Sequence, residues 1–270
     1  MFVNESSALT FWPTIRRNAR ALLSFPCDVR YSDLMSGARE RARVATTSEI
    51  LRLARAQLAA EGATALSLRA VARDLGMVSS SIYRYFPSRD DLLTALIVDA
   101  YNRLGEAAEN ADASVRRRTD FRARWRATTH AIRDWAVTNP SEWALLYGTP
   151  VPGYAAPQDT IVPATRYTLA LTGILVDMDA CGHRHVAAVP RRLRADVTNL
   201  RGVLGVDVAD ATLVLGLNAW AALMGAITLE LFGHLHNVVE EPGALYDAVV
   251  EQHMELITGT DVACATSNGA

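Results

Sequence analysis

The chain has 270 residues, half of them hydrophobic, which is enough for one large domain or for a small domain joined to a larger one. Its formal net charge of -2 excludes a uniformly basic protein, so any binding to nucleic acid must come from a local cluster of cations. Cys27, Cys181 and Cys264 lie too far apart for a disulfide framework or a thiolate metal site, which indicates a reducing cytoplasm.

The helix signals divide the chain into four segments. Residues 1–38 lack sustained periodicity and are expected to form an arm, although Met35 offers an alternative start of the protein. Residues 39–90 are expected to form a small helical domain and residues 91–260 a larger one, followed by a tail at 261–270. The apolar runs near the N-terminus are too short for a signal peptide, so no export signal is predicted.

The first two helices have recognisable ends. Thr46 and Glu49 have the spacing of a capping box, and the apolar stripe after them predicts a helix that ends at Gly62. Ser67 is a favourable N-cap for a second, short helix, which closes at Gly76.

The helical pattern continues to the end of the chain. A third helix is expected at residues 79–86, where Pro87 ends it, and a fourth at 89–105. A segment between Ala180 and Asp207 has room for one more short helix. No convincing strand alternation is found, so the predicted fold class is all-α. The remaining helices are expected at residues 116–139, 141–148, 163–180, 209–236 and 243–258.

The second and third helices have the spacing of a helix-turn-helix. Ala72 stands four residues before Gly76, and Ile82 stands six residues after it. A small residue at 72 lets the two helices approach closely, and glycine at 76 supplies the left-handed backbone of a tight turn. Two short helices joined by a glycine turn occur in many helical proteins, so this spacing alone leaves the function open.

The sequence on both sides of this pair of helices indicates one family of proteins. Together with the preceding helices, the segment Tyr-Arg-Tyr-Phe-Pro-Ser-Arg-Asp-Asp-Leu-Leu at residues 83–93 resembles the TetR family of bacterial regulators. The resemblance is close over residues 44–100. It implies a three-helix DNA-binding domain followed by a helical bundle for ligand binding and dimerisation. It also implies a repressor that binds double-stranded operator DNA and is released by a small apolar or aromatic effector.

The resemblance further implies which side chains contact DNA. The residues implied for base or groove contacts are Arg69, Ser79, Ser80 and Ser81. Those implied for phosphates are Ser67, Tyr83, Arg84, Tyr85 and Arg89, with Arg89 where the family usually has lysine. The alternative is that Tyr83 packs against the fourth helix and that Arg84 is ordinary solvated surface.

Two segments of the second domain resemble a C-terminal domain named for a Trp-His-Gly pattern. They are Trp-Ala-Leu-Leu-Tyr-Gly-Thr-Pro at residues 143–150 and the segment that begins at Trp220 and ends at Gly233. Met224 stands where that pattern has histidine, which puts any role of the histidine in doubt here.

An effector pocket is expected among the helices at 116–180, where aromatic rings with polar tips gather. Such surfaces favour apolar or aromatic small molecules. The alternative is that these rings form ordinary core. The candidate pocket residues are Trp125, Trp135, Trp143, Tyr147, Tyr154 and Tyr167.

A homodimer is expected, because one short recognition helix reads too few bases. Apolar residues recur at spacings of four and three in the two last helices, which predicts a four-helix bundle across a two-fold axis. Gly216 and Gly225 would permit close approach there. The alternative is burial within one subunit. The candidate interface residues are Leu213, Leu217, Trp220, Met224, Ile227, Leu231, Leu245, Val249 and Leu256.

Other functions are less favoured by the sequence. The uncharged segment at 211–229 is long enough to span a bilayer, but acidic flanks and a central Asn218 favour a buried helix and no membrane. Histidine pairs at 183 and 185 and at 234 and 236 are poorly spaced for a metal on a helix, so neither a metal nor a cofactor is expected. No catalytic motif is found, and an enzyme is not expected. The remaining alternative is a helical ligand-binding or protein-interaction module without DNA binding.

Overall fold

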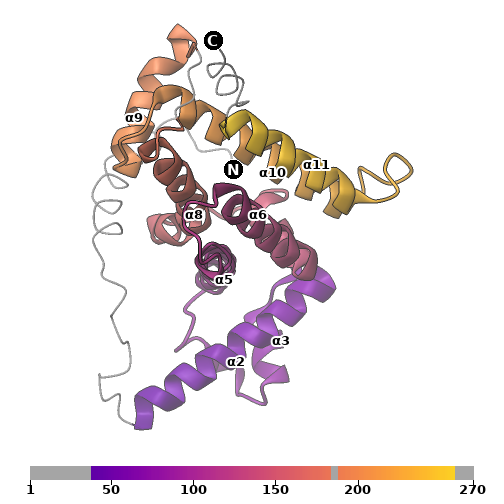
Figure 1. Cartoon of the computed structure of the whole chain (residues 1–270). Helices are drawn as coiled ribbons and strands as arrows, with labels where there is room; N and C mark the ends of the chain where they lie inside the picture. Colours follow the sequence, from indigo (N-terminus) through magenta and orange to yellow (C-terminus); the bar gives the residue numbers. More distant parts are fainter. Residues whose placement is uncertain (1–37, 184–187, 259–270) are drawn as a thin grey trace, which may run out of the picture.

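The computed structural model describes residues 38–183 and 188–258, and these residues form helices and connecting loops with no strand among them (Figure 1). The expected all-α fold is confirmed. The predicted arm, apart from Ala38, and the predicted tail at 261–270 lie outside the described residues. Met35 also lies outside them.

From residue 38 on, the N-terminal part consists of three helices and the beginning of a fourth. They are α2 (Ala38–Glu61), α3 (Leu68–Asp74), α4 (Ser79–Ile82) and α5 (Arg89–Ser114), with the 3-10 turn η1 (Ala63–Ala65) between α2 and α3. Helix α4 is half as long as predicted, because the chain turns after Ile82, and the amide groups of Tyr85 and Phe86 both donate to its carbonyl.

The predicted capping box is wrong. Helix α2 already includes Ala38, so Thr46 lies in its interior, where the hydroxyl donates to the Ala42 carbonyl at 2.8 Å. Glu49 pairs with Arg52 one turn later instead of reaching back to a helix start. The threonine hydroxyl bonds to nearby backbone groups in both positions, since it accepts from an amide at a cap and donates to a carbonyl inside a helix, so the pattern did not distinguish the two.

A small apolar core holds the N-terminal helices together. Ile50 of α2, Val71 of α3 and Ile82 of α4 are at most 1% exposed and belong to one buried cluster. Leu92 and Leu96 of α5 belong to the same cluster. The first turns of α5 therefore belong to the core of the N-terminal part, although α5 continues into the larger part.

The C-terminal part packs six further helices around the rest of α5. In Figure 1, α5 is seen end-on, with α6 and α8 beside it and with α10 and α11 on the far side of α6. The short helix anticipated between residues 180 and 207 is α9. The helices are α6 (Phe121–Thr138), α7 (Pro140–Tyr147), α8 (Ile161–Ala180), α9 (Arg194–Leu204), α10 (Asp210–Leu231) and α11 (Pro242–Thr258), with 3-10 turns η2 (Gln158–Thr160) and η3 (Arg191–Leu193).

Several helix ends differ from those predicted for physical reasons. Helix α5 runs to Ser114 rather than to 105, and α6 begins at Phe121 rather than at 116. Asp120 caps α6, because its carboxylate accepts from the Ala123 amide at 3.0 Å. Helix α10 ends at Leu231 rather than at 236. Gly233, two residues after this end, has a φ of 76°, which a right-handed helix does not contain.

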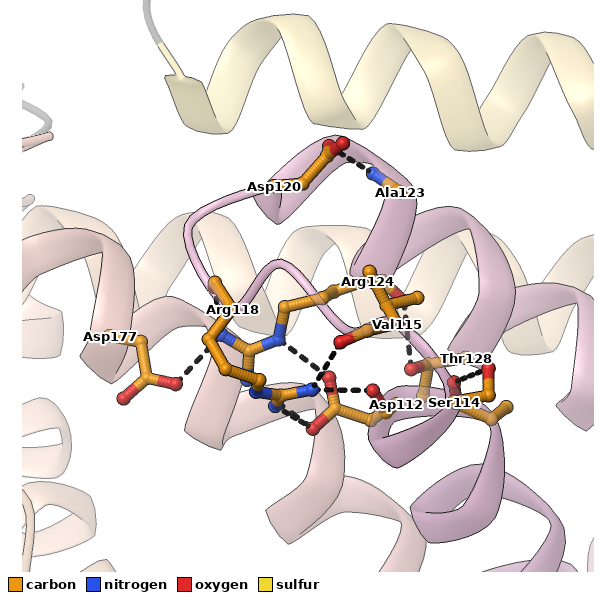
Figure 2. Close-up of polar contacts among 10 residues, drawn as sticks. Asp112, Ser114, Val115, Arg118, Asp120, Ala123, Arg124, Thr128 and Asp177 are labelled. Carbon is orange, nitrogen blue, oxygen red and sulfur yellow. Dashed lines mark hydrogen bonds and ion pairs between the residues drawn. The ribbon is translucent and has the colours of Figure 1, made fainter.

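A buried arginine ties three of these helices together (Figure 2). Arg124 of α6 is 2% exposed, and its guanidinium donates to the Asp112 carboxylate of α5 at 2.7 Å and to Asp177 of α8 at 2.8 Å. It also donates to the carbonyl of Arg118, whose own side chain pairs with Asp112. Each of the three guanidinium nitrogens therefore has a partner, which a buried charge requires.

Helix α10 meets the length and composition of a membrane span, with a mean hydropathy of 1.7 in its most apolar window, one third of which is buried. Its inner face lies in the C-terminal core, where Ala219, Leu223 and Ile227 are fully buried. Its two acidic ends pair with arginines of the same chain, Asp210 with Arg201 and Glu230 with Arg133. These contacts support a core helix.

Candidate DNA interface and regulatory site

The predicted turn between α3 and α4 is present. Ser67 caps α3 by accepting from the Ala70 amide at 3.4 Å. Gly76 has a φ of 69°, a backbone conformation that residues with a side chain rarely adopt. The amide of Met77 donates to the carbonyl of Ala72 at 2.8 Å. Ala72 is fully buried, which allows the close helix contact that its small size predicts.

Most of the predicted DNA-contacting residues are accessible. Arg69, Ser79, Ser80 and Arg84 are exposed, and Tyr83 is 42% exposed. This exposure agrees with DNA contact and equally with the alternative in which the Tyr83 ring is half-buried against the fourth helix, so both stay open. Hydroxyl and guanidinium groups exposed on a short recognition helix are suitable donors to phosphates and base edges.

Other residues predicted to contact DNA pack against or bond to groups of the protein itself. The Arg89 guanidinium is half-buried and donates to the carbonyls of Ala63 at 2.8 Å and Leu66 at 3.2 Å, so it holds η1 against the start of α5. Tyr85 packs against the N-terminal core and is only partly exposed. Ser81 and Ser67 are likewise partly buried.

One exposed residue was not anticipated. Val78 is the N-cap residue of α4 and is 73% exposed. Recognition helices contact base edges with their N-terminal residues, and an exposed apolar side chain there suits the methyl group of thymine. The available signal was a pair of apolar residues, Met77 and Val78, between the turn glycine and three serines.

The six predicted pocket aromatics do not line one cavity. Trp125, Trp135, Trp143 and Tyr167 are at most 9% exposed and belong to the C-terminal core. Tyr154 lies apart from them, against the N-terminal core, with its hydroxyl 2.9 Å from Thr94 Oγ1. None of the six lines the cavity at residues 230–242 or the cavity between residues 58–64 and 141–152.

Two of these aromatics, Tyr147 and Tyr167, are joined by a hydrogen bond between their hydroxyl groups. Tyr147 lies against Trp143, with ring centroids 4.4 Å apart, and its hydroxyl donates to that of Tyr167 at 2.7 Å. The indole of Trp220 donates to the same Tyr167 oxygen at 2.9 Å. Burial raises the pKa of Tyr147 and of Tyr167, and it raises the pKa of nearby Tyr101 to about 12. These phenols therefore stay protonated at neutral pH.

The two segments of the Trp-His-Gly resemblance contact each other. The Trp143 indole of α7 donates to Thr228 Oγ1 of α10 at 3.3 Å. Met224, at the position of the pattern's histidine, is 7% exposed, and its sulfur lies 4.0 Å from the Tyr167 hydroxyl. A thioether accepts weakly and does not titrate, so it cannot act as the histidine of the pattern.

The predicted dimer residues divide into two groups. Leu213, Met224 and Ile227 are buried within the subunit, while Leu231 and Val249 are partly buried against its core. Leu217, Trp220, Leu245 and Leu256 are 36–48% exposed. A spacing of four and three cannot separate these groups, because α10 presents apolar residues both to its own core and to solvent.

The two glycines of α10 differ in the same way. A Cβ atom added at Gly216 would lie 2.6 Å from the side chain of Leu175, so this glycine allows α10 to approach α8 within the subunit. A Cβ atom at Gly225 would meet nothing within 4 Å. Of the two, only Gly225 is placed to let a second helix approach from outside.

Residues 38–183 and 188–258 contain no group of three or more side chains suited to hold a metal. His183 packs edge-to-face on Phe121, at 5.7 Å between ring centroids, and His185 lies outside the described residues. Cys181 is an exposed free thiol.

A short recognition helix held by a glycine turn on a three-helix core, followed by a helical bundle, defines the class of helix-turn-helix transcriptional regulators. Family models agree with this assignment. Residues 50–96 match the model described as bacterial regulatory proteins of the tetR family, and residues 125–253 match the model described as the tetracyclin repressor-like C-terminal domain. The Trp-His-Gly resemblance stays a prediction.

Relatives lead to the same family. HTH-type transcriptional regulator Rv1816 of Mycobacterium tuberculosis strain H37Rv is 42% identical over 221 residues, which cover 78% of this chain and 92% of that protein. Regulator Mb1846 of Mycobacterium bovis has the same identity and coverage. The chain belongs to the TetR family of bacterial regulators, whose members are regulators of transcription and not enzymes.

Solved structures are similar over most of the chain. The regulatory protein SCO4313 is 32% identical, with a TM-score of 0.68 over 81% of this chain and 99% of that one. A protein of unknown function from Rhodococcus sp. RHA1 is 23% identical, with a TM-score of 0.57 over 82% and 98% of the two chains, and shares the fold.

Proposed function

We propose that this regulator is a cytoplasmic homodimeric repressor that binds operator DNA through α3 and α4 and is released by a small apolar or aromatic effector. The observation that supports it best is the exposed set on and beside α4, since Ser79, Ser80, Tyr83 and Arg84 have accessible polar groups on a helix-turn-helix whose Ala72 and Ile82 are fully buried. In this proposal Ser79 and Ser80 face base edges, and Tyr83 and Arg84 bind phosphates.

Val78 is added to the proposed contacts. Its exposed isopropyl group gains by covering a thymine methyl, and it has no polar atom to be left unpaired there. Arg89 has a structural role in this proposal and does not bind phosphate, because its guanidinium already donates to backbone carbonyls. Ser67 similarly serves first as the cap of α3.

The proposed interface is an exposed apolar face shared by α10 and α11. It consists of Leu217, Ala221, Gly225 and Leu229 on α10 and of Leu245, Ala248 and Leu256 on α11. Contiguous exposed apolar surface is typical of association sites. Two such faces related by a two-fold axis form the four-helix bundle expected from the sequence.

Replacing Arg84 with alanine tests the DNA-binding part of the proposal. We expect the variant to bind the DNA flanking its own gene about tenfold or more weakly than the wild type, and the slope of log affinity against log salt to fall by about two for a dimer. Fluorescence anisotropy at two salt concentrations measures both quantities.

The matched control is Arg116→Ala. Arg116 is an exposed arginine in the connection between α5 and α6, so the variant loses the same charge outside the proposed interface. Equal weakening in both variants would show that only net charge matters. Unchanged binding by Arg84→Ala would remove this residue from the interface.

A further inference from the structure

A cleft of about 600 Å³ lies between the DNA-binding part and the regulatory part of the chain. One wall is the end of α2 with η1, at residues 58–64, and the other is α7 with the loop that follows it, at residues 141–152. Phe232, just beyond α10, completes the lining and is 40% exposed. The volume lies within the usual range of small-molecule sites, which is roughly 300–1,000 Å³.

The lining specifies the chemistry of an occupant. None of the described residues that line the cleft carries a formal charge, although about a fifth of the whole chain is charged. Apart from backbone groups, the polar groups of the lining are the hydroxyls of Thr64, Ser141 and Thr149. An ionised ligand that moves from water into this cleft would meet no opposite charge to offset the cost of its desolvation. A neutral ligand does not have this cost.

The cleft is also mechanically connected to the DNA-binding helices. Two of its lining residues, Ala63 and Thr64, offer the carbonyls that accept from Arg89 at 2.8 Å and 3.4 Å. Arg89 is the first residue of α5, and Leu92 and Leu96 of α5 belong to the same buried cluster as residues of α3 and α4. Arg89 and this shared core therefore connect η1 to the helix-turn-helix.

We propose that this cleft is the effector site, and that it takes a neutral, largely apolar molecule with a hydrogen-bonding group. The inference rests on the proposed repressor function and moves its effector from the packed aromatic cluster to the junction of the two parts. An occupant that contacts both walls fixes the separation of α2 and α7, so it weakens operator binding through η1 and Arg89.

Two probes with the same rings test the binding chemistry. N-phenyl-1-naphthylamine is neutral, and 8-anilinonaphthalene-1-sulfonate adds one negative charge. We expect the fluorescence of the neutral probe to saturate at one molecule per subunit, and the sulfonate to bind about tenfold more weakly or worse. Failure of the neutral probe to bind, or equal binding of the sulfonate, would overturn the assignment.

A matched pair of variants tests the location. Ala59 lines the cleft, while its neighbour Ala60 is exposed outside the lining, so Ala59→Trp fills the cleft and Ala60→Trp adds the same ring elsewhere. We expect probe binding to be lost in Ala59→Trp and kept in Ala60→Trp. Binding retained by Ala59→Trp would place the probe in the aromatic cluster or on the α10–α11 face, and would refute the proposal.

The same samples then test regulation. Saturating N-phenyl-1-naphthylamine is expected to weaken binding to the DNA flanking the gene about tenfold in the wild type and in Ala60→Trp, but not in Ala59→Trp. Unchanged DNA affinity with the probe bound would refute the regulatory role of the cleft. If the protein without probe does not bind DNA, the proposed repressor function fails, while the probe titration still decides whether the cleft is a ligand site.

Discussion

Replacing Arg124 with alanine is expected to lower the free energy of unfolding by about 3 kcal/mol or more, because it breaks a buried ion pair from one side. Arg124 is 2% exposed, and its removal leaves the Asp112 carboxylate, whose side chain is 18% exposed, with only the partner supplied by Arg118. It also opens a void between α5, α6 and α8. Denaturation in urea followed by circular dichroism measures the change.

The control for Arg124 is Arg118→Ala, because both arginines pair with the same carboxylate. Arg118 is 47% exposed, so its pair is screened by water, and its loss should cost about 1 kcal/mol or less. Equal losses of unfolding free energy in the two variants would contradict the conclusion that the buried Arg124 stabilises the contact of α5, α6 and α8.

The effect of Arg124→Ala should depend on pH. Desolvation raises the pKa of Asp112, but hydrogen bonds from Arg124 and Arg118 outweigh it and hold the pKa below the ordinary value of 3.8. A lowered carboxyl pKa adds stability above the unfolded value, and this contribution is lost as the pH falls through the folded value. The difference between wild type and Arg124→Ala should therefore shrink below about pH 4.

Replacing Leu217 with glutamate is expected to weaken dimerisation about 100-fold or more. In the proposed dimer, the two-fold axis would bring one new carboxylate from each subunit into an apolar contact where neither has a partner. Leu217 is 45% exposed in the subunit, so the substitution leaves the core intact. Sedimentation velocity over a range of micromolar concentrations measures the association, and thermal unfolding confirms that the monomer is folded.

The matched control for Leu217 is Leu193→Glu. Leu193 of η3 is 41% exposed and lies outside the α10–α11 face, so the same change of charge there should leave the dimer unchanged. A dimer that survives Leu217→Glu would exclude this face. Dissociation by both variants would mean that added charge alone separates the subunits.

Local chemistry made the N-terminal part predictable. Ser67 caps a helix, Gly76 adopts a left-handed turn and Ala72 is buried, and each of these depends on residues only a few positions apart. The order and type of the later helices followed from apolar periodicity in the same way. Thr46 shows the limit of such signals, since its hydroxyl bonds within a helix that extends further toward the N-terminus.

The site depends on contacts between distant segments, and these were harder to predict. The sequence predicts that Arg89 binds phosphate, whereas in the structure its guanidinium donates to the carbonyls of Ala63 and Leu66. The apolar stripe of α10 has the same spacing whether a leucine faces its own core, as Leu213 does, or solvent, as Leu217 does. The cleft is formed by segments about 80 residues apart, together with Phe232, and no local pattern marks it.

Selection of bound duplexes from a random library with the purified wild-type protein tests operator binding by a dimer directly. We expect enrichment of an inverted repeat, with half-site centres about one helical turn or a multiple of it apart, because the proposed dimer relates two recognition helices by a two-fold axis. Recovery of no enriched sequence, or of a single site without symmetry, would contradict operator binding by a dimer through α4.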